Sequence, residues 1–226
     1  MKIFKLLFVI VAVSAMFLLT GCGYDIKYEM LNSMSDVRYN LFEAKTESMK
    51  VTLMCGMREE PYEYNGVSNQ KCEFGVITVY FTELQEAEEI EFTLQAGDIE
   101  YTSALERNPF HHNYMTDIEA LIDDEANVYL TIDGIGSEMI LVCVSKNWGV
   151  QYQNALEIAT EHFEIDAKQF FNNRKFNAEC YLKIIYDENS DLETYLWYFG
   201  IVGTDNNRLS LVVDVNSGQI LASSIE

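Results

Sequence analysis

Between residues 37 and 145 the sequence consists of short runs in which apolar and polar residues alternate. A period of two residues is the pattern of β-strands that bury one face. Turn-forming pairs such as Asn65-Gly66, Gly97-Asp98 and Asp133-Gly134 separate the runs. The expected strands are residues 37–45, 49–57, 73–81, 90–95, 99–105, 128–132 and 138–145, with a short helix at 115–122. Short strands at this spacing predict an antiparallel β-sandwich or open barrel over residues 36–147.

After Trp148 the pattern changes to a helical one. An amphipathic helix is predicted, because apolar residues recur on one face. These residues are Tyr152, Ala155, Leu156, Ala159 and Phe163.

A second helix is expected to begin at Asp166, which has the features of an N-cap. Gln169 stands three residues later, where a capping-box partner belongs, and Ile165 and Phe170 are spaced as a hydrophobic staple. Four strands are then expected as a meander, at residues 176–186, 195–202, 208–215 and 219–225.

Two motifs in residues 151–226 resemble the PepSY-type module, a small helix-plus-sheet unit of peptidase propeptides and bacterial envelope proteins. One is the helical stretch 155–159, and the other is the closing hairpin at 213–221, with Asp214, Gly218 and an apolar strand after them. The resemblance covers about a third of the chain. It implies binding or inhibition more often than catalysis, and it supplies no catalytic residues.

These patterns predict an α+β chain. The β-sandwich or open barrel at 36–147 would be followed by a two-helix, four-strand PepSY-like domain at 148–226. The boundary is placed where the two-residue period gives way to the helical one.

The N-terminus has the pattern of a lipoprotein signal peptide. Lys2 and Lys5 flank the start of an apolar run at 6–19, which is shorter than the roughly 17 to 25 residues of a membrane span. The following Leu19-Thr20-Gly21-Cys22 resembles the bacterial lipobox. This resemblance implies a diacylglyceryl group on the thiol of Cys22 and cleavage of residues 1–21 between Gly21 and Cys22. An ordinary cleaved signal peptide or an uncleaved anchor is the alternative.

A lipid on Cys22 would hold the mature chain to the cell membrane on its extracytoplasmic face, with residues 22–35 as a tether. Two acyl chains satisfy the two-signal condition for stable anchoring. The membrane is therefore an expected partner.

The chain is strongly acidic, with 15 basic and 36 acidic residues and a net charge of −21. Loss of residues 1–21, which hold two of the lysines, would make the charge about −23 (13 basic against 36 acidic). Nucleic acids and anionic surfaces attract clusters of Lys and Arg, so this charge argues against nucleic acid as a partner.

Four cysteines remain if Cys22 carries lipid. Cys143 and Cys180 lie in apolar runs and are expected as small buried hydrophobic residues. Cys55 and Cys72 flank one predicted hairpin and form the one plausible disulfide, which an exported chain permits. The alternative is that both residues are free thiols.

The candidate binding surface consists of aromatic residues and one arginine, types that are enriched at protein interfaces. Arg58, Tyr62 and Tyr64 lie in a turn-rich loop, and Tyr195 and Trp197 lie in an aromatic strand. A long hairpin loop that packs its own tyrosines is the alternative explanation for the first three.

No motif for a catalytic site, metal or cofactor occurs, so catalytic residues, metals and cofactors are not expected. His111 and His112 are expected to lie in a loop, and His162 is expected to be a packed or partly exposed residue of its helix. Residues 187–191 have the oxygen spacing of a calcium loop. Leu192 and Tyr198 replace its required glycine and glutamate, so an acidic turn is expected.

The sequence therefore predicts a non-catalytic, membrane-anchored lipoprotein that binds an envelope protein or peptide, for example by restraining a peptidase. An envelope lipoprotein that binds a cation or a small ligand is the alternative. A hydrolase with a site dispersed along the chain is a third hypothesis.

Overall fold

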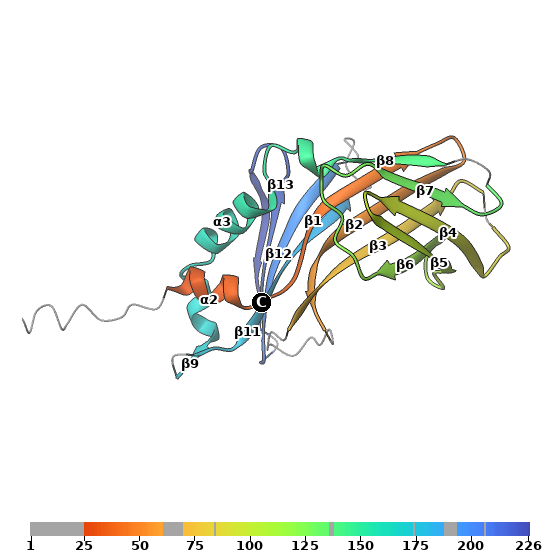
Figure 1. Ribbon diagram of the computed structural model, residues 1–226. Coiled ribbons are helices and arrows are strands. Elements are labelled where there is room, and N and C mark those ends of the chain that lie inside the picture. The colour runs from red at the N-terminus through yellow and green to blue at the C-terminus, as the bar shows by residue number, and fades with distance from the viewer. Residues whose placement is uncertain are drawn as a thin grey trace, which may run out of the picture.

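The computed structural model describes residues 25–60, 70–83, 85–135, 138–173, 175–187, 194–205 and 207–226. Its N-terminal strands are β1 (Met34–Lys45), β2 (Met49–Glu59), β3 (Lys71–Phe81), β4 (Glu89–Ala96), β5 (Ile99–Arg107), β6 (Asn113–Ile118), β7 (Val128–Ile132) and β8 (Met139–Cys143). Its C-terminal strands are β11 (Ala178–Asp187), β12 (Thr194–Gly203), β13 (Arg208–Asp214) and β14 (Ile220–Ile225). All twelve belong to one sheet, in the order β14-β13-β12-β11-β1-β2-β3-β6-β5-β4-β7-β8 (Figure 1).

Strands β1 to β8 close into an eight-stranded antiparallel barrel. The ring is completed where Phe42 and Glu43 of β1 pair with Cys143 and Val142 of β8. A barrel of eight strands is just wide enough for side chains to fill its interior. The inward-facing residues at 0 % exposure include Phe42, Leu53, Ile77, Phe92 and Leu130.

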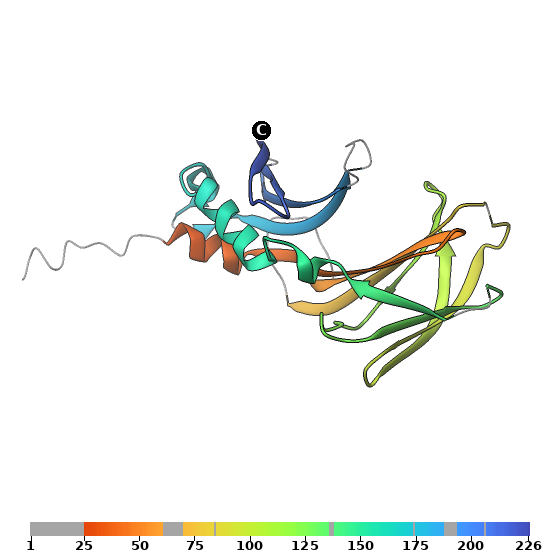
Figure 2. The ribbon, with the colours of Figure 1, turned by 90° about the horizontal axis from the view of Figure 1, so that it is seen from above.

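The C-terminal strands form an antiparallel meander that continues the barrel sheet. The connection is β1, whose first residues pair in parallel with β11, at Met34 with Cys180 and Val37 with Leu182. Two α-helices, α2 (Ile26–Asn32) and α3 (Tyr152–His162), contact each other and lie against this part of the sheet (Figures 1 and 2). The remaining short elements are η1 (Ser145–Asn147), η2 (Asp166–Phe170), β9 (Phe171–Asn172) and β10 (Lys175–Phe176).

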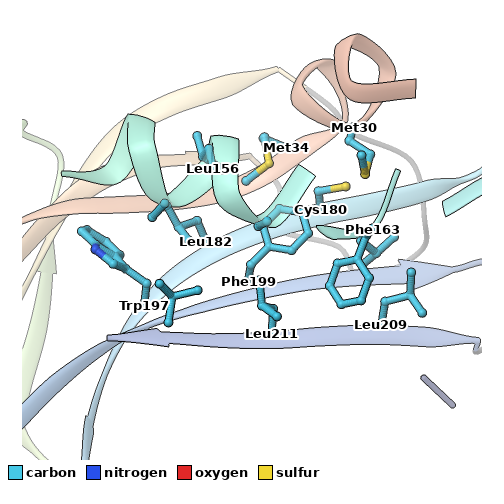
Figure 3. Close-up of a cluster of buried hydrophobic side chains, with 14 of the residues drawn as sticks. Met30, Met34, Leu156, Phe163, Cys180, Leu182, Trp197, Phe199, Leu209 and Leu211 are labelled. Atoms are coloured by element: carbon cyan, nitrogen blue, oxygen red, sulfur yellow. The ribbon is translucent and has the colours of Figure 1, made fainter. Parts of the chain in front are cut away.

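A second hydrophobic core lies between the helices and the C-terminal strands. Met30 of α2 and Leu156 of α3 lie over Phe199 and Leu211 of the sheet (Figure 3). All four side chains are at most 9 % exposed. Leu41 of β1 belongs to this core while its neighbour Phe42 belongs to the barrel core, so β1 contributes alternate faces to both.

The predicted fold class is therefore wrong. Strands make up 57 % of the structure and helices 14 %, the barrel is closed, and the C-terminal part is not a two-helix PepSY-like unit. Its strands extend the barrel sheet through β1. Periodicity identifies strands and their buried faces, but it carries no information on which strand edges meet.

The helix expected at 115–122 is also absent, because residues 113–118 form β6. Met115 pairs with Thr78 of β3 and with Glu106 of β5. Pairing on both edges outweighs the weak local preference for a helix.

The second helix of the C-terminal part is a five-residue 3-10 turn, η2. Ile165 takes the N-cap position and no side-chain capping hydrogen bond forms, so Asp166 is not the cap. Ile165 is 74 % exposed and makes no staple with the buried Phe170.

Part of the predicted tether is folded. Asp25 caps α2 by accepting a hydrogen bond from the backbone N–H of Tyr28 at 3.1 Å. Ile26 and Met30, one turn apart, bury their side chains against the second core. Within the described residues, no helix is both long enough and apolar enough to cross a bilayer.

The described cysteines Cys55, Cys72, Cys143 and Cys180 are free thiols. The plausible disulfide does not form, because Cys55 lies opposite Gly75 on β3 whereas Cys72 lies opposite Arg58 on β2. The two cysteines are thus three positions apart along the hairpin. Burial raises the pKa of the Cys55 thiol to about 12.

Candidate functional site

The sheet divides at β1, and this division creates a cleft. One edge of β1 pairs with β2. Along its other edge, β1 pairs first with β11, as far as Leu182 of β11. Further along the same edge, Phe42 and Glu43 of β1 pair with β8. Past Leu182, β11 continues with β12 and diverges from the barrel wall (Figure 2). The outer face of the barrel and the end of the β11–β12 hairpin therefore face each other across an opening.

The cleft has a volume of about 390 Å³ and takes its lining from both walls. The barrel contributes Leu41, Lys45, Lys50, Thr52, Met54 and Tyr80, and the hairpin contributes Ile184, Tyr186 and Tyr195. Leu41 and Ile184 are buried and form an apolar floor, whereas Tyr80 is 43 % exposed. On β2, Lys50, Thr52 and Met54 alternate with inward-facing barrel residues, which explains why all three point into the cleft.

A polar cluster around Lys50 holds the two walls together. The Lys50 ammonium lies 2.9 Å from Oε1 of Glu43 and donates a hydrogen bond to the Tyr195 hydroxyl at 3.2 Å. It also lies 4.3 Å from the ring centroid of Tyr186, within range for a cation–π contact. The Tyr195 hydroxyl in turn donates to Glu43. Barrel and hairpin are therefore cross-linked by polar contacts within the cleft.

These contacts set the charge of the lining. Burial, and next its hydrogen bond to Glu43, raise the pKa of Tyr195 well above its ordinary value. Tyr195 is thus a neutral hydrogen-bond donor at physiological pH. Glu43 balances Lys50, whereas Lys45 is exposed and has no ion-pair partner among the described residues. The charged residues of the lining are thus two lysines, Lys45 and Lys50, in a chain whose net charge is −21.

The chemistry of the lining suits recognition. It offers flat phenol faces, a flexible thioether at Met54, a hydroxyl at Thr52 and an accessible ammonium at Lys45. Tyrosine and methionine are enriched at protein interfaces, and methionine adapts to irregular surfaces. A ligand with flat or apolar groups and an anionic group near Lys45 complements this set.

The predicted binding residues do not form one surface. Tyr195 lines the cleft. Trp197, two residues along β12, is only 1 % exposed, and its indole N–H donates to the carbonyl oxygen of Val150 at 2.9 Å, so its assignment to a surface is wrong. Tyr62 and Tyr64 lie outside the described residues, as do Gly21 and Cys22.

Arg58 lies at the other end of β2 from Lys50, eight residues away, or roughly 26 Å at about 3.3 Å per residue. Its guanidinium pairs with Asp117 at 2.7 Å and stacks over the ring of Phe74 at 4.6 Å. It lines a separate opening of about 460 Å³. Arg58 and Tyr195 therefore cannot act in one small site.

Sequence reasoning missed the lysines and Tyr80. The outward positions of Lys45 on β1, Lys50 on β2 and Tyr80 on β3 follow from alternation. That β11 and β12 cover this stretch of the barrel wall depends on a long-range pairing that no local pattern records. The described residues bring together no group of three or more His, Cys, Asp or Glu side chains that could hold a metal ion. Most of the predicted acidic turn, residues 188–191, lies outside the described part of the chain.

Comparisons with models of protein families, with curated proteins and with solved structures found no match for this chain.

Proposed function

We propose that this chain is a bacterial lipoprotein, anchored through Cys22 on the extracytoplasmic face of the membrane, that binds an extended segment of an envelope protein or peptide in the cleft. The observation that carries the binding role is a cleft lined by tyrosines and lysines. The contacts among Glu43, Lys50 and Tyr195 link its two walls. Restraint of a peptidase is no longer part of the proposal, because it rested on the PepSY-like fold.

An extended segment fits the shape of the cleft. The opening follows β11 beyond Leu182, where pairing with β1 ends and the strand runs on beside the barrel wall. A peptide in this position would lie along strands on both sides, with its side chains against Tyr80, Tyr186 and the apolar floor. Extended peptides commonly bind beside existing strands in this manner. The charge at Lys45 favours a segment with an acidic residue.

The anchor is supported by the lipobox-like Leu19-Thr20-Gly21-Cys22 and by the short apolar run before it. Asp25, the N-cap of α2, stands three residues after Cys22 in the sequence. Because a chain spans at most about 3.6 Å per residue, this short separation from Cys22 would keep the protein close to the membrane surface.

Replacing Cys22 by alanine is expected to abolish processing, because the thiol is both the acyl acceptor and the landmark for cleavage. Mass spectrometry of the membrane fraction should show a diacylglyceryl-modified N-terminal cysteine in the parent chain and an unprocessed, unlipidated chain in the variant. A Cys72→Ala variant is the control and should be processed normally. A mature parent chain with an unmodified Cys22 would contradict the anchor while leaving the cleft proposal standing.

Replacing Tyr80 by alanine is expected to weaken peptide binding about tenfold, or ~1.4 kcal/mol, the effect of removing one aromatic contact. Backbone amide shifts of the detergent-solubilised full chain would be followed during titration with short blocked peptides that contain acidic and aromatic residues. Shifts should concentrate on the cleft lining. Tyr28→Ala, at a tyrosine that is 60 % exposed on α2, is the matched control and should bind like the parent.

Two results would overturn the cleft as the binding site. One is the absence of shifts in the lining residues with every peptide of the panel. The other is an equal loss of binding in Tyr80→Ala and Tyr28→Ala.

A further inference from the structure

The mouth of the barrel, at the end away from helices α2 and α3, contains a small pocket. Strand β1 begins beside α2, so the connections that follow β1, β3, β5 and β7 gather at the opposite end (Figure 1). A pocket of about 270 Å³ lies there, lined by residues at the ends of β3, β5 and β6 and by the connections between them. The mouths of β-barrels are common positions for small-molecule sites.

This mouth pocket is separate from the cleft, because neighbouring residues of β3 face opposite sides of the barrel wall. Tyr80 points outward and lines the cleft. Phe81 packs against the barrel core and lines the mouth pocket. The two openings have no described lining residue in common.

Aromatic rings form the apolar part of the mouth pocket. Phe81 and Tyr114 pack edge to face, with ring centroids 5.6 Å apart. The Tyr114 hydroxyl donates to the carbonyl oxygen of Ala87, so this hydroxyl is already engaged within the chain. The two rings therefore offer a ligand an aromatic surface and no free phenol.

One polar group of the lining differs from its neighbours. The Thr82 hydroxyl donates to the carbonyl oxygen of Glu47 at 3.1 Å, and the side-chain amide of Gln85 donates to a backbone carbonyl at 3.1 Å. By contrast, Asn113 is 7 % exposed and its Oδ1 accepts no hydrogen bond from any described residue. A buried acceptor without a donor is costly, and native structures rarely keep one. A donor group on a ligand in the pocket would satisfy it.

Charged groups of both signs border the mouth pocket. The guanidinium of Arg107 lies 3.6 Å from Glu88, whose side chain is 83 % exposed, and a pair so open to solvent is weak. The exposed His112 adds a second nitrogen group on the lining. Glu83 is exposed and has no ion-pair partner among the described residues. The lining therefore complements a molecule that carries both a carboxylate and an ammonium group.

We propose that the mouth of the barrel binds a free α-amino acid with an aromatic side chain. The carboxylate would pair with Arg107, and the ammonium group would donate to Oδ1 of Asn113 on the side of Glu83. The side chain would pack on the rings of Phe81 and Tyr114. The pocket is at the small end of the usual range of roughly 300 to 1,000 Å³, which suits a molecule of this size. This proposal does not depend on the ligand of the cleft.

Calorimetric titration of the detergent-solubilised full chain with three compounds tests which ligand groups are recognised. The compounds are phenylalanine, hydrocinnamate, which lacks the ammonium group, and phenylalaninamide, which lacks the carboxylate. Phenylalanine should bind, and each of the other two should bind at least about tenfold more weakly, because each leaves polar groups of the pocket without a partner.

Two variants test the residues. Arg107→Gln should weaken phenylalanine binding at least about tenfold, because the partner of the carboxylate is lost. Asn113→Leu keeps a similar size and removes the acceptor, so it should also weaken binding about tenfold. Arg58→Gln is the matched control and should bind like the parent. The side chains of Arg58 and Arg107 are 30 % and 32 % exposed and each pairs with a carboxylate, but Arg58 lines a different opening.

The proposal fails if phenylalanine gives no binding up to about 10 mM, or if the three compounds bind equally. It also fails if Arg107→Gln and Arg58→Gln lose binding to the same extent, or if a folded Asn113→Leu variant binds like the parent. Should Asn113→Leu not fold, the three compounds and the two arginine variants still decide the outcome.

Discussion

Replacing Trp197 by alanine should lower the free energy of unfolding by about 3 to 5 kcal/mol, the usual cost of removing a large buried aromatic side chain. Trp197 is 1 % exposed and packs edge to face against Trp148, with ring centroids 5.2 Å apart. Its indole also donates to the carbonyl of Val150. The substitution would leave a cavity at one end of the second core and an unsatisfied carbonyl beside it.

Chemical denaturation of the detergent-solubilised full chain, followed by circular dichroism, measures this loss. Trp197→Phe keeps most of the apolar volume but lacks the donor, so it should fall between the parent and the alanine variant. Tyr28→Ala, at an exposed site, should stay within about 0.5 kcal/mol of the parent. A loss of less than about 1 kcal/mol for Trp197→Ala would mean that this side chain is not part of the core.

Trp197 also shows how far strand alternation can be used. Alternation correctly places Tyr195 and Trp197 on one face of β12, but it does not say which part of that face is covered. Trp148 and the residues before α3 lie over Trp197, whereas Tyr195 lies where the hairpin diverges from the barrel. One position is therefore core and the other lines a cleft, although their sequence patterns are alike.

Local patterns predicted the long elements and failed where a long-range pairing decided the outcome. The helix at 152–162 has a full apolar face, and the strands β2, β3 and β11 to β13 have clear alternation, so they lie close to their expected positions. Barrel closure depends on the pairing of Phe42 with Cys143, which are 101 residues apart in the sequence. No period within either segment records that contact.

The shortest elements were missed for a different reason. Helix α2 has seven residues and only one buried pair, Ile26 and Met30, which is too little to establish a helical period. At η2 the capping pattern was present, but the chain enters β9 after five residues and an α-helix has no room to form. A capping signal marks where a helix can begin and says nothing of the length available to it.

Glu179 should make the protein less stable as pH rises from about 4.5 to about 7, and Glu179→Gln should remove this dependence. Its side chain, on β11, is 0 % exposed, and neither carboxylate oxygen has a hydrogen-bond partner among the described residues. Burial, followed by the charge of Glu59, raises the pKa of Glu179 to about 7, and the charge of Lys183 opposes the rise only in part. Desolvation of the ionised form is therefore the dominant effect.

The sign follows from proton linkage. The folded chain holds a proton on Glu179 up to about pH 7, whereas the unfolded chain releases it near the ordinary value of 4.5. Between these values the folded state binds more protons, so stability falls as pH rises and becomes level above about pH 7. Glu179→Gln keeps a neutral group of similar shape. It should stabilise the chain on the order of 1 to 3 kcal/mol near pH 8, and this gain should shrink to nothing as pH approaches about 4.5.

Denaturation of parent and variant across this pH range distinguishes a buried carboxyl from an ordinary one. Glu100→Gln, at an exposed glutamate in β5, is the control and should change stability little at any pH. A Glu179→Gln effect of the same size near pH 5 and near pH 8 would mean that the carboxyl is solvated. A loss of stability near pH 8 would mean that the charge of Lys183 outweighs burial and that the ionised form is the one the fold holds.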